Sequence, residues 1–541
     1  MLLNAVNLTK SIGAKILFQD LKFTIMPGEK IALIGRNGHG KTTLLKMLSG
    51  EDQNFSGEIS TRKNARIILT KQEHHDTGEL TPLQYVLENA PNYFEYKKVL
   101  DEYEAGTSTN LNRYLKVLEK FTDLNYFNLE SSILSTFAAF NISDKSAQEP
   151  LANLSGGEKR YIEMTKLMFS KSDLLLVDEP TNHMDFQGKE RFISWLRSLK
   201  QTVFVITHDR DVLHHVTKII ELKDKKINTF KGNFKNYTSQ NTIQTLSSVK
   251  LYSDQLNQLK EAKKRMEWGR QMRAKSKQWK TRYDHWLKDY EKIKAAAVKP
   301  SFWIDQNAVG DLDKKVVDSY QKFKEKNINI KVTTKKSFGM VLMSVKKLTL
   351  GYKEPVFENL NFSIKEGQRL FIKGKNGAGK STLVKTILSL SKNKQPQATI
   401  LDGNIKLNQD LRIGEYEQEI DHKYLDMTLE NAIRKSYEDK NAPITDQEIY
   451  KLLAQYLFNP RLEGKQKIRE LSGGQKARFQ LIKMFVGNPN LLILDEPTNH
   501  LDLPSIEELE NSLTKFSGGI LYISHDTYFI KRMGGDTIEL S

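Results

Sequence analysis

Short apolar runs closed by glycine or acidic residues recur along this chain. KIALIG (Lys30 to Gly35) and LLLVDE (Leu174 to Glu179) have the length and β-branched content of strands that are buried on both faces of a sheet. The first run leads directly into a glycine-rich loop and then into a helical pattern. This order of strand, loop and helix predicts an α/β core built on a parallel sheet.

The same order occurs twice. The loop sequence GRNGHGKTT (Gly35 to Thr43) recurs as GKNGAGKST (Gly374 to Thr382), and four further sequence elements follow each loop in the same order. Aligning the two copies predicts one domain over residues 1–238 and a second over 340–541. The residues between them, 239–339, belong to neither copy and are expected to form a separate linker.

The linker has a helical pattern of its own. Apolar residues at three-four spacing between Val249 and Ile293 predict a long amphipathic helix that ends at Pro300. A second, shorter stripe between Leu312 and Phe323 is expected to pair back on it. The pattern therefore predicts a long α-helical hairpin between the two domains.

Two segments of the linker compete for the tip of this hairpin. The pairing above places the tip at Ala295 to Asp311, and we favour this position. The alternative is the basic stretch RQMRAKSKQWKTR (Arg270 to Arg282), with Gly269 breaking the first helix. The two alternatives expose different aromatic and basic side chains.

A further insertion distinguishes the first copy from the second. Between matching motifs, Gln72 to Leu154 spans 82 positions, whereas Gln418 to Leu471 spans 53. Within the longer stretch, residues 93–121 read as two short helices around a glycine-containing turn. This insertion is either a small projecting arm or an ordinary variable helical subdomain.

Composition narrows the class of protein. The chain has 541 residues, of which 38% are hydrophobic, and this is enough for several globular domains. It contains no run of 18 apolar residues, and its first residues lack a signal-peptide pattern, so we expect a cytoplasmic protein. The chain has no cysteine, which excludes disulfides, thiolate metal sites and cysteine nucleophiles.

The charge of the chain is concentrated in the linker. The formal net charge is +17, and residues 241–340 carry 23 Lys and Arg against 11 Asp and Glu, which is +12 of that total. A basic, aromatic hairpin is typical of a protein that binds a polyanion, with nucleic acid as the first candidate. The alternative is a charged helix pair that only stays solvated and spaces the two domains.

The glycine-rich loops predict phosphate binding. In G-x-x-x-x-G-K-[ST], glycine lets backbone N–H groups approach phosphate oxygens, and the helix that follows adds its dipole. Lys41 and Lys380 are expected to reach the outer phosphates. Thr42 and Ser381 are expected to place a hydroxyl on Mg²⁺.

Acidic pairs at the ends of two apolar runs complete this chemistry. Asp178 and Asp495 end the runs and are placed to hold Mg²⁺. Glu179 and Glu496 follow them and are candidates for the base that polarises the attacking water. The sequence therefore predicts two sites for ATP hydrolysis, with ATP and Mg²⁺ as cofactors.

Two further motifs carry a resemblance to a known family. LSGGE (residues 154–158) and LSGGQ (471–475) resemble the signature motif of ATP-binding cassette proteins. DEPTNHMD (178–185) and DEPTNHLD (495–502), in a chain with two cassettes and no membrane span, resemble the soluble ABC-F subfamily, whose members bind ribosomes. The resemblance implies two tandem P-loop cassettes, here called cassette 1 and cassette 2, of α/β fold and joined by the hairpin.

The resemblance also assigns roles to single residues. In the family each signature faces the nucleotide held by the other cassette, which implies that Ser155 faces Lys380 and Ser472 faces Lys41. His208 and His525 match the switch histidine, and Gln72 and Gln418 match the Q-loop glutamine. Tyr352 lies where the family stacks an aromatic ring on adenine, whereas cassette 1 has Ile12 there.

The expected site residues follow from these motifs. The catalytic residues are Glu179, Glu496, His208 and His525, and the Mg²⁺ ligands are Thr42, Asp178, Ser381 and Asp495. The nucleotide-binding residues are Gly35, Asn37, Gly38, Gly40, Lys41, Thr42, Thr43, Gln72, Ser155, Gly156, Gly157, Asp178, Tyr352, Gly374, Asn376, Gly377, Gly379, Lys380, Ser381, Thr382, Gln418, Ser472, Gly473, Gly474 and Asp495. The linker residues expected to contact RNA are Arg270, Arg273, Lys275, Lys277, Lys280, Arg282, Lys299, Phe302 and Trp303.

The resemblance implies a function as well as a fold. Such a protein is a monomer whose cassettes close on ATP and which then binds the 70S ribosome near the tRNA exit site. Its linker tip approaches rRNA, the P-site tRNA and the peptidyl-transferase centre. The outcome is protection from antibiotics or rescue of stalled translation, without a membrane subunit. The alternative is the ATPase component of a transporter that acts with a separate membrane protein.

Overall fold

The computed structural model describes the whole chain except residues 14, 71–78, 141, 183, 298–302, 306–319, 321–327, 329, 331–338, 353, 418–419 and 541. Its contacts divide it into two units. One unit joins Met1–Thr229 to Ile328–Ser541 and holds both cassettes, and the other is Phe230–Asn327. The expected boundary at residue 238 lies inside helix α10, which begins at Phe234.

Cassette 1 is built on two sheets. A six-stranded sheet has the order β5-β6-β7-β3-β8-β9, and a three-stranded antiparallel sheet has the order β2-β1-β4. The predicted strands are present: β3 and β6 are parallel neighbours of β7, and every residue of β6 is buried. The strands are β1 (Leu3–Ile12), β2 (Lys15–Ile25), β3 (Lys30–Gly35), β4 (Ser56–Thr61), β5 (Ile67–Leu69), β6 (Leu174–Asp178), β7 (Thr202–Ile206), β8 (Lys218–Lys223) and β9 (Lys226–Lys231).

Cassette 2 repeats this architecture. A five-stranded parallel sheet has the order β14-β15-β16-β12-β17, and a three-stranded antiparallel sheet has the order β11-β10-β13. The predicted fold class, two tandem α/β cassettes, is confirmed. The strands are β10 (Val341–Gly351), β11 (Pro355–Lys365), β12 (Arg369–Gly374), β13 (Thr399–Leu407), β14 (Ile413–Tyr416), β15 (Leu491–Asp495), β16 (Gly519–Ile523) and β17 (Asp536–Leu540).

Several helices begin at a residue whose side chain caps them. Helices α7 and α19, which follow the two signature motifs, both start with a capping box, in which Ser155 pairs with Glu158 and Ser472 with Gln475. The cassette helices are α1 (Lys41–Ser49), α2 (Pro82–Glu88), α3 (Tyr93–Glu104), α4 (Leu111–Asp123), α5 (Leu129–Ala139), α6 (Asp144–Gln148), α7 (Gly156–Phe169), α8 (Phe186–Ser198), α9 (Arg210–Leu213), α14 (Lys380–Ser391), α15 (His422–Leu425), α16 (Leu429–Glu438), α17 (Asp446–Gln455), α18 (Pro460–Glu463), α19 (Gly473–Met484), α20 (Leu503–Thr514) and α21 (Thr527–Met533).

The insertion in cassette 1 contains the helices α3 and α4. They are joined by a turn in which Gly106 has φ +72°, a left-handed conformation that favours glycine. Tyr103 and Tyr114, one from each helix, stack with ring centroids 4.2 Å apart. The helices therefore pack on one another as a small antiparallel pair.

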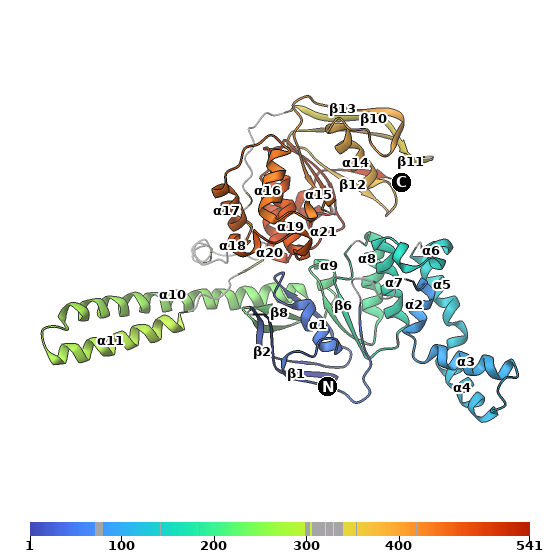
Figure 1. Cartoon of the computed structure of the whole chain (residues 1–541), viewed down its shortest axis with the longest axis horizontal. Helices are drawn as coiled ribbons and strands as arrows, with labels where there is room; N and C mark the ends of the chain where they lie inside the picture. Colours follow the sequence, from blue (N-terminus) through green and yellow to red (C-terminus); the bar gives the residue numbers. More distant parts are fainter. Residues whose placement is uncertain are drawn as a thin grey trace. The chain divides into compact units, whose positions relative to one another are not determined.

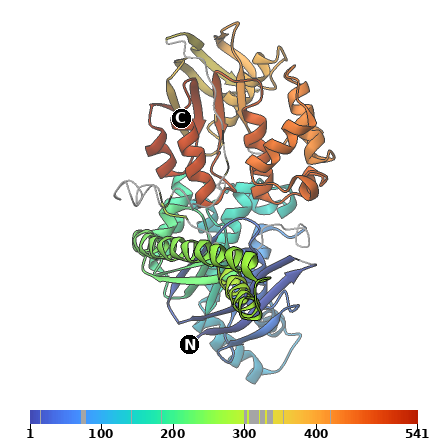
Figure 2. The same cartoon turned by 90° about the vertical axis from the view of Figure 1, so that its left-hand side faces the viewer.

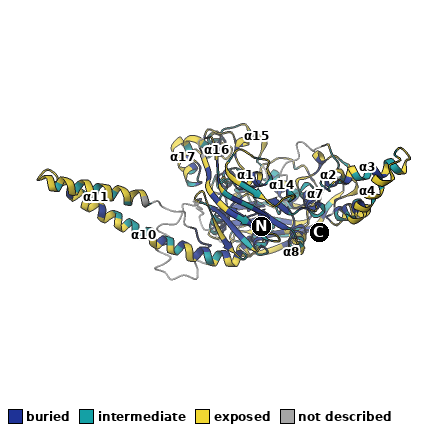
Figure 3. Ribbon diagram, turned by 90° about the horizontal axis from the view of Figure 1, so that it is seen from below, coloured by how far each residue is buried: buried dark blue, intermediate teal, exposed yellow. Residues whose placement is uncertain are grey.

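The linker unit contains a helical hairpin. Helices α10 (Phe234–Met272) and α11 (Lys277–Ala296) run side by side (Figure 1), as is also seen from the end (Figure 2). Most of their surface is exposed, in contrast to the buried strands of the cassettes (Figure 3). The favoured tip at Ala295 to Asp311 is wrong, because the described chain turns between Met272 and Lys277, inside the alternative basic stretch.

Two local features explain why the chain turns there. Gly269 is buried against Trp286 of α11, since a Cβ on Gly269 would lie 2.8 Å from the ring carbon Cε3. Ser276 then caps α11, because its Oγ accepts a hydrogen bond from the Trp279 N–H at 3.3 Å. Glycine thus lets the helices approach, and the serine starts the second helix.

Trp303 does not lie at the tip. Its side chain is only 6% exposed, it stacks with Tyr237 at 6.4 Å between ring centroids, and its carbonyl accepts a hydrogen bond from Asn241. The structure therefore assigns Trp303 to the packing of the linker on itself, and its expected role as an exposed RNA contact is wrong. Lys299 and Phe302 lie outside the described residues.

We expect Gly269→Val to loosen the hairpin. The added side chain meets Trp286, and overpacking of this kind costs about 1–3 kcal/mol, which exceeds the 0.5–1 kcal/mol that replacing a helical glycine returns. Hydrogen exchange of the α10 and α11 amides measures the loss. Gln271→Val, at an exposed position of the same helix, is the control and should leave protection unchanged. Equal protection in both variants would contradict the packing described.

Candidate functional site

The glycine-rich loop of cassette 1 connects β3 to α1. Gly38 and Gly40 have φ +77° and +93°, and a Cβ on Gly38 would meet no atom within 4 Å. The loop therefore presents open backbone that a phosphate group can approach closely. Gly40 is the N-cap of α1, so the helix dipole points at the same place.

The loop of cassette 2 has the same conformation. Gly377 and Gly379 have φ +86° and +87°, and Gly379 is the N-cap of α14. A Cβ on Gly379 would lie 2.7 Å from Val356, so this position is closed to any larger residue. Both predicted phosphate-binding loops therefore form.

Each loop holds the expected lysine at its centre. Lys41 Nζ donates to the carbonyl of Gly35 at 2.7 Å, and Lys380 Nζ donates to the carbonyl of Gly374 at 2.8 Å. Burial lowers the pKa of both lysines, and nearby carboxylates, Glu179 and Glu496 respectively, oppose this change. Each ammonium group is thus held by backbone carbonyls where outer phosphates are expected.

The proposed Mg²⁺ ligands meet in pairs. Thr42 Oγ1 donates to Asp178 Oδ2 at 2.8 Å, and Ser381 Oγ donates to Asp495 Oδ2 at 3.3 Å. Hydroxyl and carboxylate oxygens suit Mg²⁺, which commonly binds through one or two protein groups plus substrate phosphates. The described part of the chain has no group of three or more His, Cys, Asp or Glu side chains that could hold a metal ion. Each pair can hold the ion once a nucleotide supplies phosphate oxygens.

The candidate bases lie beside the switch histidines. Glu179 and Glu496 have φ +45° and +51°, a strained conformation for glutamate that both copies retain. His208 Nε2 lies 3.8 Å from Glu179 Oε1, and His525 Nε2 lies 3.4 Å from Glu496 Oε1. Strain at the same carboxylate in both copies points to a functional constraint.

Burial changes the protonation of these groups. It raises the pKa of Glu179 to about 8, helped by the adjacent charge of Asp178, and raises that of Glu496 to about 8 in the same way. Burial lowers the pKa of His208 to about 3 and that of His525 to about 4. Both histidines are therefore neutral at pH 7, where a ring nitrogen can accept a proton or a hydrogen bond.

Some of these buried atoms lack hydrogen bonds among the described residues. They are both ring nitrogens of His208, Nδ1 of His525 and Oε1 of Glu496. Buried polar atoms in native proteins almost always have partners, so orphaned atoms mark places where a ligand or water completes the site. The residues of both sites thus fit a bound nucleotide and the water that attacks it.

The cavity at Lys41 is shared by the two cassettes. Its volume is 780 Å³, and residues of cassette 1 and the signature residues Ser472, Gly473 and Gly474 line it. Asn37 carries the contact between the cassettes, because its N–H donates to Asp502 at 3.1 Å and its side chain donates to the carbonyl of His500 at 2.7 Å. The structure therefore brings Ser472 to the Lys41 cavity, as the resemblance implies.

The cavity at Lys380 is smaller, at 190 Å³, and the residues that line it in the described chain belong to cassette 2. Asn376 N–H donates to Asp185 of cassette 1 at 3.3 Å, which matches the Asn37 contact. Ser155 is not among the lining residues, and its Oγ donates to Glu158 at 2.7 Å. The structure thus does not bring Ser155 to the Lys380 cavity.

Other predicted residues are placed as follows. Ile12 is 59% exposed and lines the Lys41 cavity, whereas Tyr352 is 57% exposed and is absent from the lining of the Lys380 cavity. Gln72 and Gln418 lie outside the described residues. Cassette 1 thus has the aliphatic side chain of Ile12 at the position where the family has an aromatic ring.

Sequence reasoning missed a polar cluster between the cassettes. Arg210, two residues after the switch histidine, forms a buried ion pair with Glu510 of α20 at 3.0 Å. Thr527 Oγ1 donates to Asp211 at 2.7 Å, and the ring of His214 stacks on Tyr528. The sequence differs at this position between the copies, with Arg210 after His208 and Asp209 where the second copy has Thr527. This difference does not identify a partner 300 residues away.

The linker turn presents the basic side chains that were expected to contact RNA. All six are exposed, and arginines lie over aromatic rings: Arg273 over Tyr283 at 5.5 Å and Arg282 over Trp279 at 5.0 Å. Trp268 is 45% exposed beside them. The six residues are Arg270, Arg273, Lys275, Lys277, Lys280 and Arg282.

Comparison with known proteins agrees with this geometry. The family described as "ABC transporter" matches residues 18–182 and 357–499. The ATP-binding protein YdiF of Bacillus subtilis is 28% identical over all of this chain and 80% of its own length. ABC transporter F family member 5 of Arabidopsis thaliana is 27% identical over 99% of this chain and 74% of its own length.

Solved structures show the same fold. An archaeal ribosome recycling factor, aABCE1, in complex with the ribosomal stalk protein aP1, superposes with a TM-score of 0.58 at 16% identity, over 98% of this chain and 87% of that one. The fold and the paired phosphate sites define a twin-cassette ATP-binding protein.

The chain belongs to the ATP-binding cassette family, and its relatives confirm the resemblance to the ABC-F subfamily. Cassettes of this family use ATP with Mg²⁺, as expected from the motifs.

The buried pair Arg210 and Glu510 gives a test of the cassette contact. We expect Arg210→Met to destabilise the protein by about 3–5 kcal/mol, because Glu510 is left buried without its counter-charge. Arg210→Met with Glu510→Met should recover most of this loss, since neither charge then remains buried. Chemical denaturation of the two variants and the wild type measures both values. A double variant no more stable than Arg210→Met would contradict this account.

Proposed function

We propose that this chain is an ABC-F ATPase that binds the 70S ribosome near the tRNA exit site when ATP closes its cassettes. Hydrolysis then releases it. The linker tip contacts rRNA and the P-site tRNA and approaches the peptidyl-transferase centre. The result is protection from antibiotics or rescue of stalled translation by a cytoplasmic monomer.

The observation that carries this proposal is the exposed turn of the linker. Six basic side chains are exposed between Arg270 and Arg282, and two of them lie over aromatic rings. Basic groups neutralise phosphates, while aromatic rings and arginine planes stack on unpaired bases. The ring of Trp268 adds a partly exposed aromatic surface. Together these groups match the chemistry of structured RNA with unpaired bases.

The ATP step follows from the shared cavity. Ser472 and Gly474 of cassette 2 lie at the Lys41 cavity, so a nucleotide there would be bound by both cassettes. A ligand shifts a conformational equilibrium only by binding one state more tightly, and contacts from both cassettes provide this preference for the closed state. In hydrolysis Glu179 and Glu496 orient the attacking water, while the neutral ring of His208 or His525 holds its position.

Similar proteins support the ribosome as partner. The structure that superposes on this chain is a ribosome recycling factor, and another, a model of ribosome-bound Pelota and ABCE1, superposes with a TM-score of 0.53 at 16% identity. No described helix is long and apolar enough to cross a membrane. An exposed basic hairpin is not needed by a transporter ATPase, so the ribosome is the better candidate.

We expect the Glu179→Gln plus Glu496→Gln protein to cosediment with purified 70S ribosomes in ATP. Loss of both bases slows hydrolysis by about 10²- to 10⁴-fold while ATP still binds, so the closed state accumulates. Adding Lys41→Met and Lys380→Met, which weakens phosphate binding, is the control and should abolish cosedimentation. Absence of ATP-dependent binding, together with recovery of the protein in membrane fractions, would instead favour the transporter ATPase.

A second experiment tests the linker turn. Replacing Arg270, Arg273, Lys275 and Lys277 by Gln should weaken ribosome binding and flatten its salt dependence. Each lost phosphate contact reduces the slope of log K against log salt by about 0.7–0.9. The matched control replaces Lys250, Lys260, Lys264 and Lys288, which are exposed along the shaft of the hairpin, and keeps the same net charge. Equal slopes for the two variants would show that the turn makes no special contact.

A further inference from the structure

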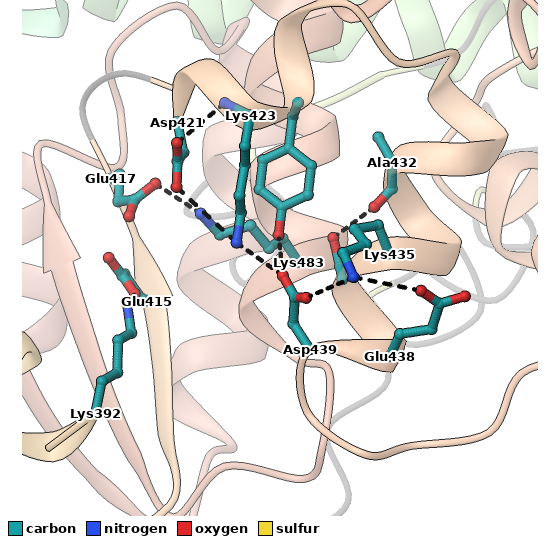
Figure 4. A network of polar contacts seen from close by, with 12 residues as sticks. Lys392, Glu415, Glu417, Asp421, Lys423, Ala432, Lys435, Glu438, Asp439 and Lys483 are labelled. Carbon is teal, nitrogen blue, oxygen red and sulfur yellow. Dashed lines mark hydrogen bonds and ion pairs between the residues drawn. The ribbon is translucent and has the colours of Figure 1, made fainter.

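Two carboxylates lie at the end of β14 in cassette 2. Glu415 and Glu417 are two positions apart and so share one face of the chain. Figure 4 shows them side by side, with Lys392 reaching Glu415 and Lys483 reaching Glu417. Glu417 directly precedes Gln418 in the sequence. The pair thus lies where β14 leads into the next segment of the chain.

Glu417 is bound to the signature helix of cassette 2. Its Oε2 lies 2.6 Å from Lys483 Nζ, and its backbone carbonyl accepts a hydrogen bond from Gln480 Nε2 at 3.0 Å. Lys483 and Gln480 both belong to α19. The charge of Glu415, in contrast, is paired with Lys392 at 3.0 Å, at the end of α14. Glu417 therefore adds an ion pair to the packing of β14 on α19, in which Gly414 lies against the carbonyl of Met484.

This contact lies on a continuous path between the two cavities. Next to β14, β15 runs parallel with Tyr416 opposite Leu494, and β15 ends at Asp495, which lines the Lys380 cavity. At its other end α19 begins with the signature, whose Gly474 packs on Asn37 in the Lys41 cavity. Lys483 lies about 16 Å along the helix from Ser472, at 1.5 Å per residue. A rigid helix thus joins Glu417 to the Lys41 cavity.

Among its described residues, cassette 1 has no such ion pair between strand and signature helix, and its lysine reaches the strand by donating to the carbonyl of Leu69 at 3.5 Å. Lys166 is the counterpart of Lys483, but it pairs at 2.6 Å with Glu163 of its own helix α7, and it donates to Tyr85 Oη at 3.1 Å. Alignment of the copies places Leu69 and Lys71 at the positions of Glu415 and Glu417. The charge of the lysine is therefore balanced within its own helix, and the strand supplies no carboxylate.

We propose that the ion pair of Glu417 and Lys483 couples the two nucleotide sites, by holding the signature helix of cassette 2 in register with the strand that leads from the Lys380 cavity. These two are positioning residues and do not touch the nucleotide. The proposal deepens the proposed function, since it rests on the binding of ATP in both cavities. Because coupling between binding sites is reciprocal, filling either cavity favours filling the other. This route adds to the direct one, since Glu496 and His525 line both cavities. The equivalent route through cassette 1 contributes little.

The charge of this ion pair changes near neutral pH. Burial and the hydrogen bond to Glu415 raise the pKa of Glu417 to about 7. Burial would also raise the pKa of Glu415, but the hydrogen bond with Glu417 and the charge of Lys392 outweigh it and lower this pKa to about 2. The other charged groups here are Lys483, Lys440, which donates to the carbonyl of Ile413, and the pair of Asp421 and Lys423, which Figure 4 shows in the same network. Protonation of Glu417 as the pH falls through 7 should therefore weaken the coupling.

The test measures ATP binding in each cavity separately. Photolabelling with an azido-ATP, followed by proteolysis, reports occupancy of cassette 1 and cassette 2 on different peptides. The protein carries Glu179→Gln and Glu496→Gln, so that binding is at equilibrium. The measured quantity is the ATP concentration that half-saturates cassette 1. The ratio to be compared between variants is this concentration in the protein with Lys380→Ala divided by the concentration with Lys380 intact. We expect this concentration to rise at least about fivefold when the Lys380 cavity is disabled.

Three variants then identify the route. Glu417→Lys, which introduces the cassette 1 residue, should bring this ratio markedly closer to one. Adding Lys483→Glu restores opposite charges and should recover most of the ratio. Glu415→Gln changes the neighbouring carboxylate, whose ion pair is with Lys392, and should leave the ratio unchanged at pH 8, where Glu417 is already ionised. In the protein with Glu417 intact the ratio should fall between pH 8 and pH 6, and the Glu417→Lys variant should show no such fall.

Other results overturn the proposal. The first is a ratio of one with Glu417 and Lys483 intact, and the second is a ratio that Glu417→Lys does not change. The third is a ratio that Glu415→Gln lowers as much as Glu417→Lys does and that the charge swap does not restore. The measurement contains no ribosomes. If the protein does not bind ribosomes, the ratio can still be measured, so the two proposals can fail independently.

Discussion

The contact between the loop of cassette 1 and the chain that follows the acidic pair of cassette 2 is the constraint on which this structure depends. Asn37 donates to Asp502 and to the carbonyl of His500, and Gly474 packs against the same side chain. These contacts put a signature motif beside a phosphate-binding loop from the other half of the chain. A nucleotide in that cavity would contact both cassettes, so its binding energy would favour the state in which they are held together. The buried pair of Arg210 and Glu510 stabilises the same association without a nucleotide.

Burial governs the chemistry within each cavity. Taking Glu179 and Glu496 out of water raises their pKa values, and it lowers those of the neighbouring histidines. These four groups therefore have pKa values far from those in solution, as is common at functional sites. The left-handed backbone at both glutamates fixes the carboxylates at the ends of their strands. Both copies retain this strained backbone, whereas the polar groups that pair with Lys166 of α7 and Lys483 of α19 differ between the copies.

The linker follows different physical rules from the cassettes. Its helices pack where Gly269 meets Trp286, and its turn leaves arginines and lysines exposed beside aromatic rings. Such a surface contributes little to folding, because exposed charges gain little from one another in water. It is suited to a polyanion, which releases counterions when it binds. The nucleotide motifs thus lie in the cassettes, whereas the linker has the surface for which we propose a polyanionic partner.

The sequence by itself determined the parts of this protein that depend on short-range chemistry. Glycines at positive φ, a lysine and a hydroxyl at fixed spacing, capping boxes at the signatures and apolar strands all act within a few residues. Both cassettes and both glycine-rich loops could therefore be predicted. The turn of the linker was predicted wrongly, because a helical stripe continues through it and only the fit of Gly269 to Trp286 decides where the helices pair. Tertiary structure alone revealed the packing of Trp303 and the ion pairs of Arg210 and Lys483. Their partners are brought together by packing between distant segments, and no local pattern in the chain encodes which buried charges will meet.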